Sequence, residues 1–128
     1  MINPKEITIL YVDDEEANLF LFDVNFGSRY PVFTASSGGE ALSVLEANSD
    51  EIIVVISDMK MPGMNGIEFI KEARNKYSNI VYFILTGYAS NDEIEDALEN
   101  KIIYQWFTKP FNMKEVEEAI QNALMELQ

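Results

Sequence analysis

The sequence contains no histidine and no cysteine among its 128 residues. These absences exclude a Ser-His-Asp triad, a cysteine nucleophile, a Cys/His zinc site and a disulfide framework within this chain. Any chemistry must therefore depend on carboxylates, lysine, tyrosine, hydroxyl groups or a hard cation held by oxygen atoms. A chain without cysteine is compatible with the cytosol, although this does not establish a cytosolic location.

Positive charge is also scarce. Nine Lys and Arg residues stand against 22 Asp and Glu residues, which gives a formal net charge of −13. Nucleic acids and anionic membranes are bound through basic patches, so this balance argues against either as a direct ligand. The longest unbroken apolar run, residues 80–85, is too short to cross a bilayer, and residues 1–6 lack the apolar core of a signal peptide. We expect one soluble, cytoplasmic domain over residues 1–128.

The apolar residues that are present form two alternating kinds of segment. Short runs rich in β-branched and aromatic residues predict five buried strands, at 7–12, 31–35, 52–57, 80–85 and 102–107. Segments with helical spacing lie between them. Each helical segment opens with a short polar residue followed three positions later by Glu, as in a capping box: Asp13/Glu16, Ser37/Glu40, Asn65/Glu68, Ser90/Glu93 and Asn112/Glu115. This (βα)₅ pattern predicts an α/β fold, with a doubly wound parallel five-stranded sheet and helices on both faces.

Reactive side chains follow four of the five predicted strands. They are Asp13 and Asp14 after the first, Asp58 after the third, Thr86 after the fourth and Lys109 after the fifth. Ligands of open α/β sheets bind outside the carboxyl ends of the strands, so we expect these groups to meet there.

Clustered carboxylates repel one another, since two unit charges about 4 Å apart interact by roughly 4 kcal/mol at an effective dielectric constant of about 20. One lysine cannot offset three acids, so the cluster must either keep a proton or bind a divalent cation. A donor set made only of oxygen favours Mg²⁺ over Zn²⁺.

Each of these residues also has an ordinary structural interpretation. Asp13 or Asp14 could cap the first helix, and Asp58 could open a turn. Thr86 and Lys109 could belong to simple loops. The acidic run at 92–99 is interpreted as a solvated helix face. What favours a site is the coincidence of complementary groups at four strand ends.

Four short motifs, in this order and spacing, resemble the receiver domain of two-component response regulators. They are Asp13-Asp14, then Asp58 ahead of Met61-Pro62-Gly63-Met64-Asn65-Gly66, then Leu85-Thr86-Gly87, and finally Lys109-Pro110-Phe111. Each motif is common alone, but their joint occurrence is specific, and the resemblance covers essentially the whole chain.

The resemblance implies a flavodoxin-like sheet with strand order 2-1-3-4-5. It implies that a histidine kinase or phosphotransfer protein phosphorylates Asp58 and that a downstream protein or output domain reads the result. It further implies that Asp14 and Asp58 bind Mg²⁺ directly, with Asp13 acting mostly through water and Lys60 contributing its backbone carbonyl. The Thr86 hydroxyl and the Lys109 ammonium would bind the phosphoryl oxygens, and the Lys109–Pro110 bond would be cis.

The resemblance also implies a conformational switch. Thr86 would move toward the phosphoryl group, and an aromatic residue of the fifth strand would fill the space that it leaves. The family usually has Tyr or Phe three residues before the lysine, whereas this chain has Trp106. Lys60 and Tyr88 occupy the positions that flank the approach of water, which predicts slow loss of the phosphoryl group.

Two other functions remain open at this point. One is a receiver-like interaction module that never takes phosphate, although the complete set of functional residues argues against it. The other is a Mg²⁺-dependent phosphatase with Asp58 as nucleophile. Against it, Lys60 stands where the second Asp of such an enzyme would be. We therefore predict a signalling switch rather than an enzyme acting on a separate substrate.

Overall fold

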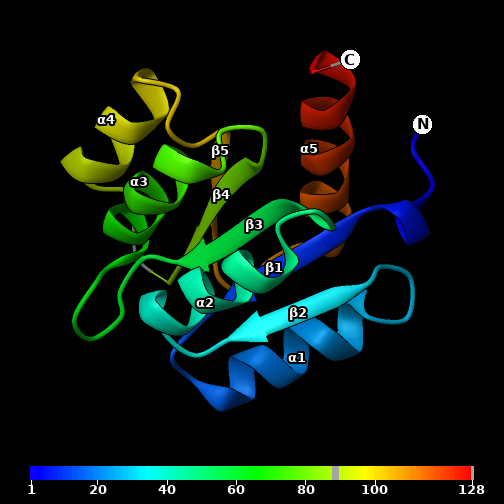
Figure 1. Cartoon of the computed structure of the whole chain (residues 1–128), viewed down its shortest axis with the longest axis horizontal. Helices are drawn as coiled ribbons and strands as arrows, with labels where there is room; N and C mark the ends of the chain where they lie inside the picture. The colour runs from blue at the N-terminus through cyan, green and yellow to red at the C-terminus, as the bar shows by residue number, and fades with distance from the viewer. Residues whose placement is uncertain (88–89, 128) are drawn as a thin grey trace.

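A computed structural model describes residues 1–87 and 90–127, which form a parallel sheet between two layers of helices (Figure 1). The strands are β1 (Thr8–Val12), β2 (Val32–Ala35), β3 (Ile52–Asp58), β4 (Val81–Thr86) and β5 (Gln105–Thr108). All pairings are parallel, in the order β2-β1-β3-β4-β5. The predicted doubly wound, flavodoxin-like α/β fold is therefore confirmed.

In the described residues, a 3₁₀ turn at Pro4–Glu6 precedes β1, four α-helices connect successive strands and a fifth follows β5. The helices are α1 (Glu16–Phe26), α2 (Gly38–Asn48), α3 (Gly66–Lys76), α4 (Asp92–Glu99) and α5 (Met113–Glu126). Helices α1 and α5 cover one face of the sheet and α2, α3 and α4 cover the other, so that the sheet separates two apolar cores (Figure 1). In the part of the chain that the structure describes, no helix combines the length and the apolarity needed to cross a membrane.

The central strands are inaccessible to solvent. Every residue of β1 and β4 is buried, as is nearly every residue of β3. This burial explains why their sequences are continuously apolar instead of alternating. The polar residues that end these strands are therefore held by a rigid frame.

The fifth strand begins three residues later than predicted. Ile102 and Ile103 lie in the turn after α4, where both backbone N–H groups donate to the Ala97 carbonyl oxygen, at 2.8 and 3.3 Å. Ile103 is nevertheless buried in the core beneath α2–α4. Both isoleucines pack against this core, which explains their apolar character. Their composition resembles that of a strand, but their backbone forms the turn that ends α4.

Three of the five predicted helix caps are confirmed. In each, a short polar side chain accepts a hydrogen bond from the backbone N–H three residues on, as Ser37, Asn65 and Asn112 do. The reciprocal bond of a full capping box is present at Asn65, whose backbone N–H donates to Glu68 at 2.9 Å.

The other two predicted caps are wrong. Helix α4 is capped by Asn91, while the Ser90 hydroxyl donates to Glu95. Helix α1 has no side-chain cap at its N-cap residue Glu15, and Asp13 instead accepts from the Glu15 N–H. The Asp13 side chain lies close to the carboxylates of Asp14 and Asp58.

Gly66 at the start of α3 holds the end of β3 in place. Its N–H donates to the Met59 carbonyl oxygen at 2.8 Å. A Cβ at this position would overlap the Asp58 carbonyl oxygen and lie 2.9 Å from the Ile84 side chain. Only glycine permits this close approach, which positions the backbone of Asp58.

We predict that Gly66→Ala lowers the free energy of unfolding by about 1–3 kcal/mol, the usual cost of forcing extra atoms into a packed site. Urea unfolding followed by circular dichroism measures the loss. Gly39→Ala is the matched control, because a Cβ added there would meet nothing within 4 Å, and it should be neutral or slightly stabilising. Equal stability of the two variants would contradict the close-packing account.

Candidate functional site

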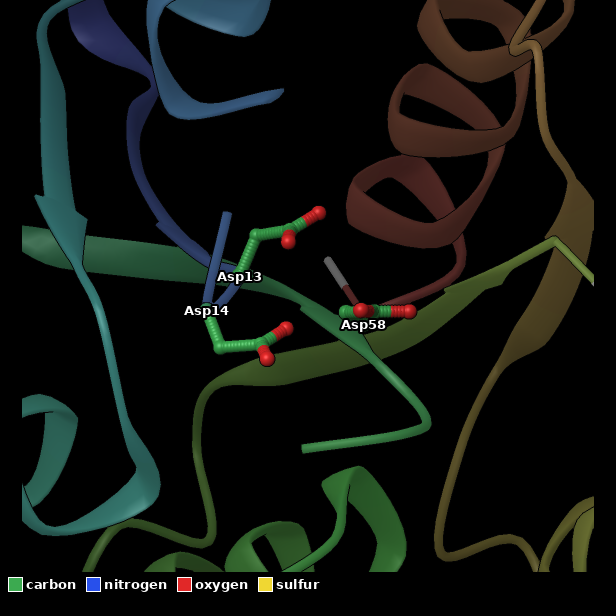
Figure 2. A group of neighbouring side chains, drawn as sticks. All are labelled: Asp13, Asp14 and Asp58. Atoms are coloured by element: carbon green, nitrogen blue, oxygen red, sulfur yellow. The ribbon is translucent and has the colours of Figure 1, made fainter. Parts of the chain in front are cut away.

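Three carboxylates meet at the carboxyl ends of β1 and β3 (Figure 2). The two strands are neighbours with Val12 paired to Ser57, so Asp13 and Asp14 leave β1 beside Asp58. One ligand oxygen from each carboxylate lies within 4.8 Å of the other two. Asp13 and Asp58 are buried, whereas Asp14 is exposed. The predicted convergence of these three acids is confirmed.

The other predicted residues follow β4 and β5. Leu85 pairs with Asp58, which places Thr86 one residue further along at the same edge of the sheet. Thr86 is buried, and its carbonyl oxygen accepts the Lys109 backbone N–H at 2.7 Å. The Lys109–Pro110 peptide bond is cis, as the resemblance implied. The backbone thus joins Thr86 directly to the residue that carries the ammonium group.

The site opens to solvent through a cleft of about 730 Å³. Its walls come from the end of β3, the first turn of α1 and the loops after β1, β3, β4 and β5. They are formed by Asp14, Glu15, Asn18, Asp58, Lys60, Met61, Pro62, Gly87 and Lys109. Lys60 is exposed on the wall of this cleft. Tyr88, which was expected to flank the approach of water, lies outside the described residues.

The Lys109 ammonium is shared between two carboxylates. Its Nζ lies 2.8 Å from Asp13 Oδ2 and 3.3 Å from Asp58 Oδ1. Burial lowers the pKa of Lys109, but the hydrogen bond to Asp13 and the charges of both acids outweigh burial and raise it overall. Burial and the charge of Asp13 raise the pKa of Asp58, and Lys109 only partly opposes this. Negative charge therefore remains in excess at the site.

The buried Asp13 carboxylate accepts four hydrogen bonds. Oδ2 accepts from the Tyr11 hydroxyl at 2.7 Å and from Lys109, while Oδ1 accepts from the Glu15 N–H at 3.0 Å and from Asn18 Nδ2 at 3.4 Å. Tyr11 and Asn18 were not among the predicted site residues. A signal did exist for Tyr11, since a tyrosine inside an otherwise apolar strand must find a partner for its hydroxyl.

The donor chemistry of the cluster fits a hard divalent cation. Asp13, Asp14 and Asp58 offer carboxylate oxygens within a small volume, and none of the three brings nitrogen or sulfur. Such an ion would also reduce the repulsion among the three carboxylates.

Trp106 is half-buried in β5 and packs against the core beneath α2–α4. It pairs with Ile84, which lies two residues before Thr86 on β4. Residues two apart on a strand point to the same face, so Trp106, Ile84 and Thr86 share one side of the sheet.

The sequence profile of one protein family matches residues 9–121, and its description is "Response regulator receiver domain". The chain is a response regulator receiver domain. Receiver domains are the phosphoacceptor signalling switches of two-component systems, and the predicted class of function is confirmed. They are signalling switches and generally not enzymes.

Individual relatives agree with this assignment. Sporulation initiation phosphotransferase F of Bacillus subtilis is 33% identical over 125 residues, which cover 97% of this receiver domain and 96% of the relative. The hydrogenase transcriptional regulatory protein HoxA of Cupriavidus necator is 29% identical over 96% of the chain, but the chain spans only 25% of that protein. The solved structure of the response regulator TrrA from Thermotoga maritima, in complex with Mg²⁺ and BeF, has a TM-score of 0.77 and is 29% identical. That match covers 91% of this chain and 97% of the other.

The electrostatics of the site predict that Asp58→Asn stabilises the metal-free receiver at neutral pH. Because the folded state raises the pKa of Asp58, its ionised form is disfavoured on folding. That destabilisation is absent below the ordinary pKa of 3.8, grows as pH rises above it and is complete once the pH exceeds the raised pKa of the folded state. With a chelator present, we expect the variant to melt a few degrees above wild type at pH 7, and the difference to shrink toward pH 4.

Asp50→Asn is the control for this measurement. Asp50 is exposed beyond the opposite end of β3, so removing its charge should change the melting temperature little at either pH. A destabilised Asp58→Asn variant would show that the contact with Lys109 outweighs burial and repulsion.

Proposed function

We propose that Asp58 is the phosphoacceptor of this receiver domain and that a histidine kinase or phosphotransfer protein donates the phosphoryl group. The observation that carries the proposal is the buried Asp58 carboxylate on the cleft wall, 3.3 Å from the Lys109 ammonium and beside two further acids. Similarity to a sporulation phosphotransferase and to a receiver bound to Mg²⁺ and BeF supports it.

Mg²⁺ would be held by the carboxylates of Asp14 and Asp58 and the backbone carbonyl of Lys60. Asp13 would act through water, which agrees with the four hydrogen bonds that its carboxylate already accepts. When bound, the ion neutralises charge on the transferring phosphoryl group. The acidic cluster fits such an ion by its oxygen donors and its uncompensated charge.

Transfer forms a bond between an Asp58 carboxylate oxygen and phosphorus. The bond from phosphorus to the donor's histidine nitrogen breaks at the same time, and that nitrogen keeps the electron pair. Catalysis of phosphoryl transfer depends mainly on positioning the reacting groups and neutralising the charge of the phosphoryl oxygens. A carboxylate, although a weak nucleophile, is therefore sufficient. Lys109 provides the positive charge, and Thr86 donates a hydrogen bond to a phosphoryl oxygen.

An apolar surface on α1 supports a protein as the donor. Ala17, Phe20, Leu21 and Val24 lie on one side of the helix, and the three larger side chains are 52–68% exposed. This surface adjoins the cleft, because Asn18 and Lys109 border both the cleft and the groove that Leu21 lines. A donor histidine that reaches Asp58 must cover this neighbourhood, so we assign the α1 surface to the phosphodonor protein.

We infer that the domain is a switch and not an enzyme that turns over a separate substrate. A phosphatase with an aspartate nucleophile needs a second carboxyl group two residues later to act as acid and base, and Lys60 stands there. Phosphorylation instead adds about −1.5 to −2 charge beside Thr86, which biases the loop after β4. We propose that Trp106, on the same side of the sheet, follows that shift, and that a downstream protein or output domain reads the change.

Incubation with acetyl phosphate and Mg²⁺ should add one phosphoryl group to the wild type and none to Asp58→Asn, as measured by intact mass. A chelator should abolish the addition. Asp50→Asn is the matched control and should be labelled like wild type. Labelling of Asp58→Asn would show that the phosphosite is elsewhere, and turnover of a separate phosphoester would favour the phosphatase.

The switch proposal predicts a change in tryptophan fluorescence. Trp106 is the single tryptophan of the sequence, so emission reports its environment directly. Adding beryllofluoride with Mg²⁺ to the wild type should shift the emission maximum and reduce acrylamide quenching, because the indole moves inward. Asp58→Asn corrects for effects of the metal alone. If both proteins respond identically, Trp106 is not coupled to the phosphosite.

A further inference from the structure

A tyrosine hydroxyl is buried inside the charged cluster. Tyr11 of β1 is 1% exposed, and its hydroxyl donates to Asp13 Oδ2 at 2.7 Å. The same oxygen accepts from the Lys109 ammonium at 2.8 Å. Two donors of different kinds therefore converge on one oxygen of a carboxylate that is fully buried. A lysine carries its charge on a flexible four-carbon stem, whereas a tyrosine carries its hydroxyl on a rigid ring.

Aromatic stacking fixes that ring. The Tyr11 and Phe22 rings are nearly parallel, with centroids 4.2 Å apart, and Phe22 stacks in turn on Phe26 at 4.4 Å. Phe111, two residues after Lys109, packs against both phenylalanines. The position of the Tyr11 hydroxyl is therefore set by packing that does not depend on its hydrogen bond.

The ammonium of Lys109 must change partners when Asp58 is occupied. It now lies between Asp13 and Asp58, at 2.8 and 3.3 Å. A phosphoryl group on Asp58 offers it stronger acceptor oxygens, so its bond to Asp13 weakens. A buried carboxylate that loses a donor is destabilised unless another donor satisfies the same oxygen. The hydroxyl of Tyr11 already donates to that same Asp13 oxygen.

We propose that Tyr11 is a positioning residue for the phosphoryl reaction: its hydroxyl keeps Asp13 Oδ2 hydrogen-bonded while Lys109 turns to the phosphoryl group. The inference rests on the proposed function of Asp58. The Tyr11 hydroxyl donates to Asp13 in the free and the metal-bound protein alike, so it stabilises both equally and leaves metal affinity unchanged. The phosphoryl-bound state, in which Lys109 has turned away from Asp13, depends on the Tyr11 hydroxyl more than the free and metal-bound states do.

The test compares two buried tyrosines. Tyr11→Phe deletes the hydroxyl and keeps the stacked ring. Tyr30→Phe is the matched control, since Tyr30 is 2% exposed and its hydroxyl donates to Glu117 on α5, away from the site. Affinity for Mg²⁺ is measured by calorimetric titration. Affinity for beryllofluoride at saturating Mg²⁺ is measured by the ¹⁹F resonance of the bound species.

Tyr11→Phe should weaken beryllofluoride binding about three- to tenfold, which corresponds to part of a hydrogen bond to a charged group, and should keep the Mg²⁺ affinity within about twofold. Tyr30→Phe should leave both affinities unchanged, although each variant loses some thermal stability. In a Lys109→Ala background, Tyr11→Phe should have no further effect on beryllofluoride, because the hydroxyl acts through Lys109.

Three results would overturn the inference. The first is a Tyr11→Phe variant that binds beryllofluoride as Tyr30→Phe does, or that does not fold. The second is an equal loss of Mg²⁺ and beryllofluoride affinity, which would place the effect in the metal site. The third is an undiminished effect of Tyr11→Phe when Lys109 is absent. Failure of the wild type to bind beryllofluoride is a separate outcome, which refutes the proposed function of Asp58 itself.

Discussion

One ammonium group serves more carboxylates than it can neutralise. Lys109 contacts Asp13 and Asp58, while Asp14 adds a third negative charge nearby. The surrounding architecture holds this imbalance in place: the buried strands β1 and β3 deliver the acids, and Gly66 fixes the backbone of Asp58. A site left short of positive charge is poised to take up a cation. Cation and phosphoryl group together can then reorganise it.

The hydrogen bonds around Asp13 place the two buried carboxylates in different environments. Asp13 accepts four bonds inside the protein, from Tyr11, Glu15, Asn18 and Lys109. Asp58 faces the cleft and shares only part of the lysine charge. The carboxylate with hydrogen-bond donors on both oxygens suits a fixed anchor, and the one that faces the cleft suits the proposed nucleophile. Environment, and not residue type, makes this distinction.

The sequence was sufficient for the fold and for the location of the site, because both follow from periodicity. Continuous apolar runs ending in Asp13, Asp58 and Thr86 indicate buried parallel strands, and such strands bring their carboxyl ends together. The predicted start of β5 was wrong because an apolar residue need not lie in a strand. Ile102 is apolar, but it lies in a turn where its N–H donates to the Ala97 carbonyl oxygen. Tyr11 was also not predicted, because no spacing rule tells which way the hydroxyl of a buried strand residue points.

The contact between Asp13 and Lys109 joins residues 96 positions apart in the chain. As the chain is synthesised, the three acids are all present once Asp58 has been made, but their counter-charge comes only with the loop after the last strand. An incomplete chain must therefore assemble the middle of its sheet against unrelieved repulsion. Contacts of such large sequence separation also form late, because the loop they close is long. Lys109 can thus relieve part of the repulsion at the centre of this sheet only after all the strands that carry the acids have been made.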